Sequence, residues 1–385
     1  MIKKLTQVLS YVLVALIAAG ATLFFTVREQ AGGYSKLEQL EALITERFIG
    51  EVDNVRIGDA AADAMVQALG DKWSYYIPAN QFSAYQDQMN NSYVGIGITV
   101  REREDGTGID ILEVTKGGPA EEAGVLAGDI IVGVDGKSTD ELDLDGIKES
   151  IRGEQGTEVK LTLRRGEETL EITVMRRTIQ TPVAVGTLLE NNIGLVTIEN
   201  FDARCRDEAV AAIKALLEQG ATKLIFDVRN NPGGYKNELV KLLDYLLPEC
   251  LVFRSEYYDG TTEEDYSDEE CLDIPMAVLI NGDSYSAAEF FAAALSDYDK
   301  AVIVGEKTSG KGYFQATFRL NDGSAVGLSV GKYYTPKGIS LADVGITPDI
   351  EIVLDAQTAA AVRAGTLDPA KDPHIQAAVD ALLKG

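Results

Sequence analysis

The stretch Met276-Ala-Val-Leu-Ile280-Asn-Gly-Asp-Ser-Tyr-Ser286-Ala-Ala-Glu-Phe290 decides the fold of the largest region of this chain. Its uninterrupted apolar run, from Met276 to Ile280, predicts a strand. The polar turn that follows leads into a helical pattern from Ser286 to about Tyr298. A strand, a turn and a helix in this order form one unit of an α/β layer.

The same unit recurs between about Thr181 and Val353. The pattern predicts strands at 193–198, 223–228, 276–280 and 301–304, and helices at 207–219, 235–247 and 286–298. Functional sites of such layers lie at the carboxyl ends of the strands, in the turns that enter the helices. The turn Arg229-Asn-Asn-Pro-Gly-Gly234 and the turn before Ser286 both occupy that position.

The residues before this layer follow two other patterns. From Tyr93 to about Ile179, short β-branched runs separated by glycines predict a small barrel or sandwich, with short helices at 119–123 and 144–151. From Tyr34 to Leu69 the apolar spacing predicts two helices. These helices, and an amphipathic segment at 373–383, either pair two subunits into a homodimer or cover their own domain, and the sequence leaves both open.

The N-terminus predicts a membrane anchor. Leu5–Val27 is a charge-free stretch of 23 residues, long enough as a helix to cross a hydrocarbon core of about 30 Å. Lys3 and Lys4 precede it, which predicts that this end stays in the cytoplasm. The expected protein is a single-pass protein of the cell membrane whose working part is extracytoplasmic. A cleaved signal peptide and a buried helix are the alternatives.

Composition excludes several classes of partner. Acidic residues outnumber basic ones by 61 to 35, giving a formal charge of −26, which argues against nucleic acid. With 3 cysteines and 1 histidine there is no zinc-binding set, so neither a metal nor a cofactor is expected. Cys250 and Cys271 flank an acidic loop, and the sequence leaves open whether they form a disulfide or two thiols.

A serine with a lysine base is the chemistry that these residues favour. The single histidine, His374, lies in a polar C-terminal stretch, so a Ser-His-Asp triad would have to use that residue. Ser286 is expected at the start of a helix, where free N–H groups create positive potential. The N–H of Ala287 and one from the turn Gly233-Gly234 are candidates for an oxyanion hole.

Lys311 can act as a base only if its amine is neutral, whereas the pKa of an exposed lysine is about 10.4. The glycines on either side of Lys311 allow close packing, and Tyr313 and Phe314 are expected to cover the amine. Gln315 lies four residues after Lys311, on the same side in a strand or a helix, and is expected to orient it.

Two stretches of the small β region resemble a PDZ domain. They are Gly95-Ile-Gly-Ile98 and the longer, more specific run from Gly118-Pro-Ala-Glu-Glu to Gly-Val-Asp-Gly136. In such a domain a glycine-rich turn leaves backbone N–H groups unpaired, so that a peptide carboxylate can accept them while the peptide adds a strand. Ile96, Gly97 and Ile98 are the expected carboxylate-binding residues.

A second resemblance covers nearly the whole chain. Asp227-Val-Arg-Asn-Asn-Pro-Gly-Gly234, the segment 281–289, and Gly305-Glu-Lys-Thr-Ser-Gly-Lys-Gly312 with Gln315 look like the carboxyl-terminal processing peptidases, also called tail-specific proteases. The resemblance implies a serine endopeptidase that recognises protein or peptide C-termini through its PDZ domain. It also implies a catalytic core related to the crotonase and Clp protease folds.

Carried over position by position, the resemblance makes Ser286 the nucleophile, Lys311 the general base and Gln315 its orienting partner. The chain departs from the family pattern at Asp283, where glycine is common, and at Ala288, where serine is common. Asp283 would place negative charge near the site and oppose a low pKa of Lys311.

The expected protein is therefore an α+β multidomain chain. We expect a cytoplasmic tip and anchor (1–30), a helical segment (31–90), a PDZ-like domain (91–179), an α/β peptidase core (180–355) and a helical tail (356–385). Two other functions remain: a catalytically latent PDZ-type peptide-binding adaptor, and an acyl-CoA enzyme of crotonase type. The second has little support, because such an enzyme has no need of an exported peptide-binding module.

Overall fold

The computed structural model describes residues 34–103, 107–139 and 144–384, and the predicted anchor at Leu5–Val27 lies outside these ranges. The chain divides into two compact units, Met1–Ala68 and Leu69–Gly385. No helix within the described ranges is both long enough and apolar enough to cross a membrane.

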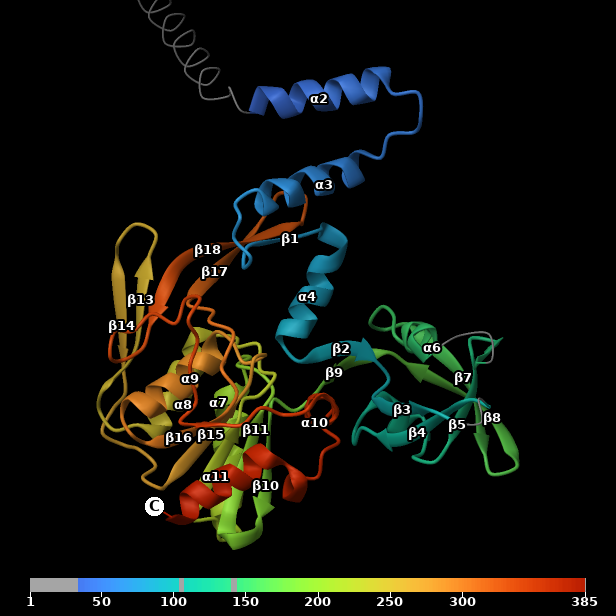
Figure 1. Ribbon diagram of the computed structural model, residues 1–385. Coiled ribbons are helices and arrows are strands. Elements are labelled where there is room, and N and C mark those ends of the chain that lie inside the picture. Colours follow the sequence, from blue (N-terminus) through green and yellow to red (C-terminus); the bar gives the residue numbers. More distant parts are fainter. Residues whose placement is uncertain (1–33, 104–106, 140–143, 385) are drawn as a thin grey trace, which may run out of the picture. The chain divides into compact units, whose positions relative to one another are not determined.

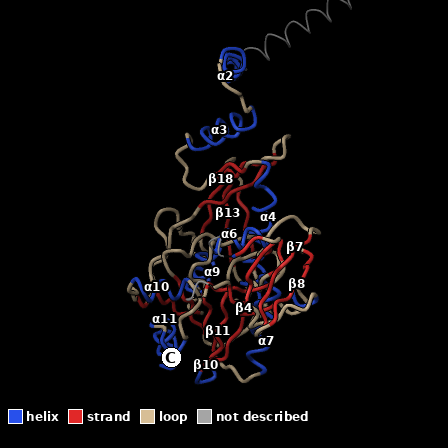
Figure 2. The backbone as a smooth tube through the Cα atoms, turned by 90° about the vertical axis from the view of Figure 1, so that its right-hand side faces the viewer, coloured by secondary structure: helices blue, strands red, loops and turns tan. Residues whose placement is uncertain are grey.

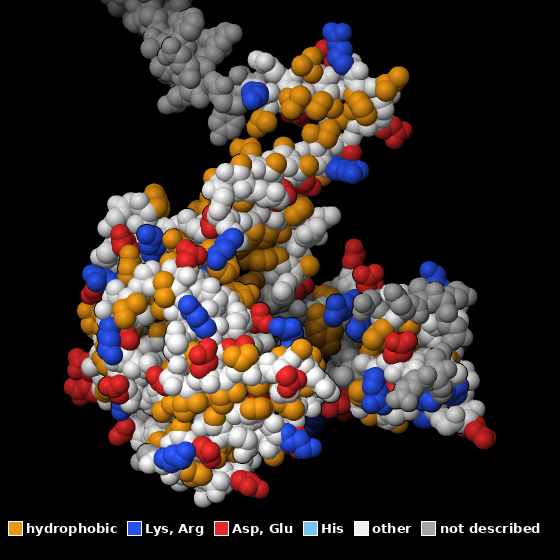
Figure 3. Space-filling model, viewed as in Figure 1, with side chains coloured by type: hydrophobic (Ala, Val, Ile, Leu, Met, Phe, Trp, Pro, Cys, Tyr) orange, Lys and Arg blue, Asp and Glu red, His pale blue; other side chains and the backbone are white. Residues whose placement is uncertain are grey.

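The first unit contributes the two predicted helices, α2 (Tyr34–Arg47) and α3 (Asn54–Gln67). Helix α3 begins after Asp53, whose carboxylate accepts a hydrogen bond from the Arg56 N–H at 3.0 Å, as a helix N-cap does. Apolar side chains lie along both helices and remain exposed, as the space-filling view shows (Figure 3). The prediction of two helices is confirmed.

The second unit is built around a six-stranded sheet (Figure 1). Its strands, in spatial order, are β10 (Ala184–Leu189), β11 (Ile193–Ile198), β12 (Lys223–Asp227), β15 (Met276–Ile280), β16 (Ala301–Gly305) and β19 (Ile350–Glu351). From β11 to β19 all neighbours are parallel, which confirms the predicted α/β layer. The edge strand β10 is antiparallel to β11, because the two are joined by a short turn.

Helices cover both faces of this sheet. Helices α7 (Cys205–Glu218), α8 (Lys236–Leu246) and α9 (Ala287–Asp297) pack on one face and α11 (Pro373–Lys384) on the other. Strand β15 is buried on both faces. Its successive residues Val278 and Leu279 belong to apolar clusters on opposite sides of the sheet. Helix α11 thus covers its own domain, while the short helix α10 (Ala356–Arg363) precedes it.

A second, antiparallel sheet was not predicted. It consists of β1 (Tyr75–Ile77), β13 (Leu251–Tyr257), β14 (Thr262–Tyr266), β17 (Tyr313–Arg319) and β18 (Ala325–Tyr334). Strand β1 pairs with β18, and β17 pairs with the same strand. The sheet therefore brings the beginning of the second unit beside the loop that carries Lys311.

The PDZ-like region forms its own sheet and core. Its strands are β3 (Ile98–Glu102), β4 (Ile109–Val114), β5 (Ile130–Val134), β6 (Lys137–Ser138), β7 (Glu158–Arg165) and β8 (Glu168–Met175), with helices α5 (Pro119–Glu122) and α6 (Leu144–Ile151). The antiparallel pair β2 (Ser92–Gly95) and β9 (Arg177–Gln180) joins its two ends, and helix α4 (Phe82–Met89) leads into it. In the tube view these strands are red and the helices are blue (Figure 2).

All three cysteines are free thiols. Cys205 is buried, and burial raises the pKa of its thiol. Cys250 and Cys271 are half-buried, and the Cys250 Sγ lies 3.3 Å from the Ser267 Oγ. Of the two alternatives for these cysteines, the structure has the thiols.

Candidate active site

Ser286 lies where strand β15 has ended and helix α9 begins, and its backbone is in an uncommon conformation. Its φ and ψ are 59° and −124°, and only 9% of the residue is exposed. A non-glycine residue in such a region costs about 1–3 kcal/mol and persists only when its surroundings enforce it. Such strain is found at functional sites. Here it orients Ser286 in the turn between the buried strand β15 and helix α9.

The glycine turn after β12 lies against this serine. A Cβ atom on Gly233 would come within 2.7 Å of the Ser286 Cβ and 2.9 Å of the Ala287 nitrogen, so only glycine fits. The predicted donor Gly233 is nevertheless engaged, because its N–H donates to the Asn231 Oδ1 at 2.8 Å. Across the described part of the chain, the N–H groups of Gly234 and Ala287 have no acceptor. These two groups, and not Gly233, are the available pair.

Lys311 reaches the same cavity from the loop between β16 and β17. This cavity, of about 560 Å³, is lined by Ser286, Lys311 and Gln315 together with the glycine turn. The Lys311 Nζ lies 4.9 Å from the ring centroid of Trp73 and 5.6 Å from that of Tyr285. Aromatic cover was expected from Tyr313 and Phe314, but Phe314 stacks on Tyr333 instead.

The amine of Lys311 is shifted toward its neutral form. Burial lowers its pKa from the ordinary value, while the charges of Glu289 and Asp71 act in the opposite direction. Asp283, expected from the sequence to oppose this shift, is half-exposed and forms an ion pair with Arg363. The carboxylates that act on the lysine are therefore two others.

Gln315 lines the cavity but makes other hydrogen bonds than the expected one. Its Nε2 donates to the Ser329 Oγ at 3.0 Å and to the Tyr313 carbonyl oxygen at 3.4 Å. No hydrogen bond joins it to Lys311 in the described ranges. The structure thus brings Ser286, Lys311 and Gln315 together without the orienting contact.

Glu289 is a site residue that the sequence analysis missed. It is completely buried in the first turn of α9, and its carboxylate accepts hydrogen bonds from the N–H groups of Ser286 (2.9 Å), Gly310 (2.8 Å) and Lys311 (2.8 Å) and from the Thr308 hydroxyl. One carboxylate therefore fixes both the serine turn and the lysine loop. The spacing Ser286-Ala-Ala-Glu289, typical of a capping box, is the signal that could have identified it.

We expect Glu289→Gln to destabilise the protein by about 2–4 kcal/mol, because the new amide nitrogen faces backbone N–H donors and leaves them unpaired. Glu306→Gln is the matched control, because Glu306 accepts one hydrogen bond, from the Leu354 N–H at 2.9 Å, and the amide oxygen can replace it. Urea unfolding of both variants measures the difference. Equal stabilities would contradict this role of Glu289.

The only histidine of the chain has a structural position. The His374 Nε2 lies 2.8 Å from the Ile352 carbonyl, to which it can only donate, so Nδ1 faces the Arg229 guanidinium as an acceptor, at 3.4 Å. Arg229 also forms buried ion pairs with Asp227 (2.6 Å) and Asp372 (2.8 Å). This cluster ties the turn after β12 to the start of α11, and His374 does not line the cavity of Ser286.

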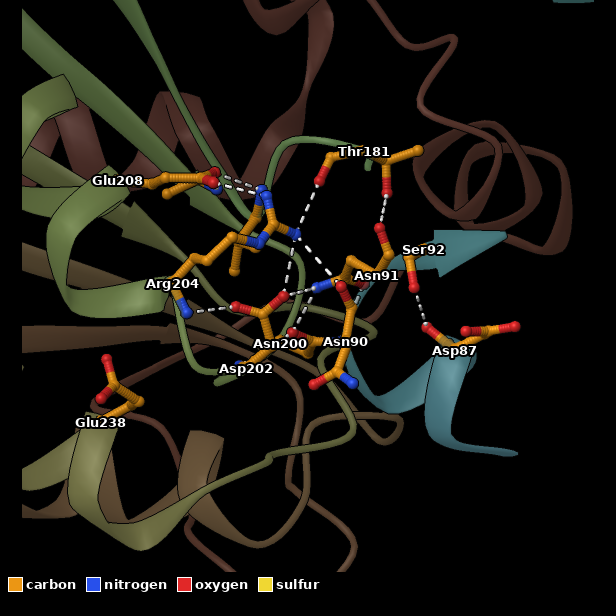
Figure 4. A network of polar contacts seen from close by, with 12 residues as sticks. Asp87, Asn90, Asn91, Ser92, Thr181, Asn200, Asp202, Arg204, Glu208 and Glu238 are labelled. Carbon is orange, nitrogen blue, oxygen red and sulfur yellow. Dashed lines mark hydrogen bonds and ion pairs between the residues drawn. The ribbon is translucent and has the colours of Figure 1, made fainter. Parts of the chain in front are cut away.

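Figure 4 shows a polar network that joins Asn200, Asp202 and Arg204 to both ends of the PDZ-like region. Asn91, just before β2, exchanges hydrogen bonds with Asn200 at 2.6 and 2.9 Å. Arg204 donates to the Thr181 carbonyl at 3.0 Å and pairs with Asp202 at 2.9 Å. Between these residues, the Phe201 N–H donates to the Gly233 carbonyl at 2.8 Å. Hydrogen bonds through Asn200 and the neighbouring Phe201 thus connect the attachment points of the PDZ-like region to the glycine turn.

The predicted peptide-binding residues lie in one groove. A cavity of about 280 Å³ is lined by Ile96, Gly97 and Ile98, by Lys148 of α6 and by Arg152, which follows that helix. The carbonyl of Gly97 accepts from the Thr115 N–H at 2.9 Å, and Gly97 has a φ of 77°. In the ranges that the structure describes, the N–H groups of Ile96 and Gly97 have no acceptor. They can therefore bind an anionic group.

A PDZ-like module attached to an α/β core, with a strained serine and a shielded lysine in one cavity, is the architecture of a PDZ-containing serine peptidase. Residues 192–352 match Peptidase family S41, and residues 111–165 match the PDZ domain. A "Probable CtpA-like serine protease" of Staphylococcus haemolyticus is 32% identical over 354 residues, which cover 88% of this chain and 71% of that protein. The chain therefore belongs to peptidase family S41.

Similarities to other known proteins support the assignment to this family. A "Probable CtpA-like serine protease" of Staphylococcus saprophyticus is 31% identical over 328 residues, which cover 84% of this chain and 66% of that relative. The chain thus spans about two thirds of the length of the curated relatives it matches. A solved structure from Bacteroides fragilis, whose description assigns it to the S41 proteases, shares the fold with a TM-score of 0.54 and 18% identity, covering 84% of this chain and 90% of the other.

Proposed function

We propose that this chain is a serine endopeptidase that cleaves peptide bonds through an acyl-enzyme on Ser286, with Lys311 as general base. One observation carries the proposal. Ser286, strained at the N-terminus of α9, and Lys311, whose amine is shielded by aromatic rings, line the same cavity. A lysine whose pKa is lowered by burial can accept the proton of a serine hydroxyl.

In the first step Lys311 takes the hydroxyl proton of Ser286 while the serine Oγ bonds to the substrate carbonyl carbon. The electron pair of the C=O bond moves to oxygen, where the N–H groups of Gly234 and Ala287 stabilise it, each by about 3 kcal/mol. The C–N bond then breaks. The ammonium of Lys311 returns the proton to the departing amine, and Ser286 is left acylated.

In the second step Lys311 removes a proton from a water molecule, whose oxygen bonds to the acyl carbon. The ester bond to Ser286 then breaks, and the proton passes from Lys311 to the serine Oγ. The new carboxyl end leaves, and both side chains are again in their starting states.

The groove between β3 and α6 is the proposed binding site for the C-termini of substrates. The unpaired N–H groups of Ile96 and Gly97 are suited to a carboxylate, and Lys148 and Arg152 add positive charge to the groove. Substrates of this class are proteins or peptides with accessible C-termini, which bind by adding a strand beside Ile98.

The setting of the enzyme is part of the same proposal. The charge-free stretch Leu5–Val27, preceded by two lysines, supports a single membrane anchor with the catalytic part extracytoplasmic. The exposed apolar side chains of α2, among them Leu40 and Leu43, support a homodimer formed through this helical segment. For the catalytic core, the parallel sheet covered by helices supports a relation to the crotonase and Clp protease folds.

Proteolysis of an unfolded test protein by the purified full chain in detergent tests the proposal. Wild type is expected to release new fragments and to become labelled on Ser286 by a fluorophosphonate, as mass spectrometry of the peptides would show. The Ser286→Ala variant is the control and should do neither. Equal cleavage by the two proteins would defeat the assignment.

A latent peptide-binding adaptor is the second candidate. In the described ranges, no hydrogen bond joins the Ser286 Oγ to the Lys311 Nζ. Such contacts are often long before substrate binds, so this geometry fits a resting enzyme as well. Binding of a peptide with a free C-terminus, without cleavage of any substrate, would favour the adaptor.

We expect Ile98→Glu to reduce cleavage of substrates with free apolar C-termini by at least about tenfold, because the new carboxylate repels the chain end. Leu126→Glu is the matched control: Leu126 is exposed and lies outside the groove. Cleavage rates are compared for a protein with a free tail and for a short peptide with an amidated end. Identical losses for both substrates would remove the role of the groove.

A further inference from the structure

One indole ring, that of Trp73, lies close to two cavities. The larger, of about 830 Å³, is lined by Trp73 and by residues of β13 and β18, including Tyr257 and Ser329. The smaller is the cavity that holds Ser286 and Lys311. Trp73 lines the first cavity, yet its ring centroid is 4.9 Å from the Lys311 Nζ in the second. The tryptophan therefore borders the larger cavity and also lies beside the amine.

The segment that carries Trp73 is held firmly in this position. The backbone N–H of Trp73 and the Ser74 hydroxyl both donate to the carboxylate of Asp71, at 3.1 and 2.6 Å. The Ser74 Oγ in turn accepts from the Ser329 N–H at 3.1 Å, which fastens the segment to β18. The Trp73 ring also lies 6.0 Å from that of Tyr285, the residue before Ser286.

We infer that Trp73 is a positioning residue for the proposed base: its indole ring closes the active-site cavity against the larger cavity and keeps water from the amine of Lys311. The inference rests on the proposed role of Lys311. It assigns a function in catalysis to a residue 238 positions away in sequence, outside the strand and helix units that form the core.

The ring acts on the amine in two opposite ways. The face of an indole attracts an ammonium group by about 0.5–2 kcal/mol, which favours the protonated form. Exclusion of water penalises the same form, by up to about 3–5 pKa units for a fully buried group. Burial is the main cause of the lowered pKa of Lys311, so we expect exclusion of water to be the larger effect of the ring.

Two substitutions separate these effects. Trp73→Ala removes the partition and lets water reach the amine, so the pKa of Lys311 should rise toward that of an exposed lysine. Trp73→Leu keeps an apolar wall but removes the ring face, so the pKa should stay low or fall further. Tyr258→Ala is the control, because Tyr258 lines the larger cavity and is exposed, and its loss does not open the partition.

The pH dependence of kcat/KM measures the result in the full chain. Because the neutral amine is the active form, activity rises with pH through the pKa of Lys311. We expect Trp73→Ala to move this acid limb upward by about one pH unit, while Trp73→Leu and Tyr258→Ala do not move it upward. A loss of activity without any shift of the limb would assign Trp73 a merely structural role and overturn the inference.

A second readout does not depend on turnover. In the Ser286→Ala background, the pH dependence of acetylation of the Lys311 amine, followed by mass spectrometry, reports its titration directly. Trp73→Ala should shift that titration upward by the same amount. If Trp73→Ala does not fold, Trp73→Gln against Trp73→Leu makes the same comparison, since the polar side chain admits water and the apolar one does not.

The outcomes separate this inference from the proposed function. If Lys311→Ala is inactive but Lys311 titrates identically in the wild type and in the Trp73 variants, only the role of Trp73 is overturned. If Lys311→Ala cleaves as the wild type does, the base assignment fails and the inference with it.

Discussion

Lys311→Ala is expected to lower kcat/KM by about 10³-fold, the middle of the range for a lost general base. The serine hydroxyl then has no group to accept its proton, although the oxyanion donors and the substrate groove remain. Lys307→Ala is the matched control: Lys307 lies in the same loop, but its side chain is exposed and does not line the cavity. It should keep the activity of the wild type.

Lys311→Arg makes the test of the base more specific. A guanidinium keeps the positive charge but cannot be deprotonated in a protein, so this variant should be as inactive as Lys311→Ala. Cleavage of a fluorogenic peptide over a range of pH gives both rates. An active Lys311→Arg variant would show that the residue supplies charge and not basicity, and would contradict the proposed mechanism.

Gly233→Ala is expected to reduce kcat by about 10²-fold or more, the cost of one lost oxyanion donor. The added methyl group would meet the Ser286 Cβ at 2.7 Å and the Tyr285 carbonyl oxygen at 2.9 Å. Because the serine turn is itself fixed by Glu289, the glycine turn must move, and with it the N–H of Gly234. The reaction should therefore lose stabilisation of the oxyanion as well as its alignment.

Gly220→Ala is the control that isolates this contact. Gly220 has a φ of 97°, close to the 88° of Gly233, but no atom lies within 4 Å of its added Cβ. Both substitutions pay the same kind of backbone strain, and only one also displaces the serine. Gly220→Ala should lower stability by about 1 kcal/mol and leave kcat unchanged. Equal kcat values for the two variants would contradict the role of the glycine turn.

The core and the principal pair of side chains could be predicted from the sequence because their signals are local. The run Met276–Ile280 predicted a strand of a parallel sheet, and Ser286 followed it at the start of a helix. The same logic placed the turn Arg229–Gly234 at the neighbouring strand end. In a parallel sheet these ends meet at one edge, so the approach of the two turns could also be expected.

The features of the site that the sequence did not predict depend on packing between segments far apart in the chain. Trp73 reaches Lys311 only because β1 pairs with β18, a contact between segments far apart in sequence. The choice between Gly233 and Gly234 depends on a side chain, Asn231, that occupies one of the two N–H groups. Gln315 lines the cavity together with Lys311, as expected. The sequence could not show that the Ser329 hydroxyl accepts the hydrogen bond of its side-chain amide.

The shared carboxylate of Glu289 also determines how the site would fail on heating. Since the N–H groups of Ser286 and Lys311 both donate to this one buried carboxylate, opening either segment leaves a buried charge with fewer donors, which favours opening of the other. The fraction of activity lost at a given temperature should then equal the fraction of molecules whose active site has unfolded. The molecules that remain would each work at full rate, and the enzyme would behave as a population with two states.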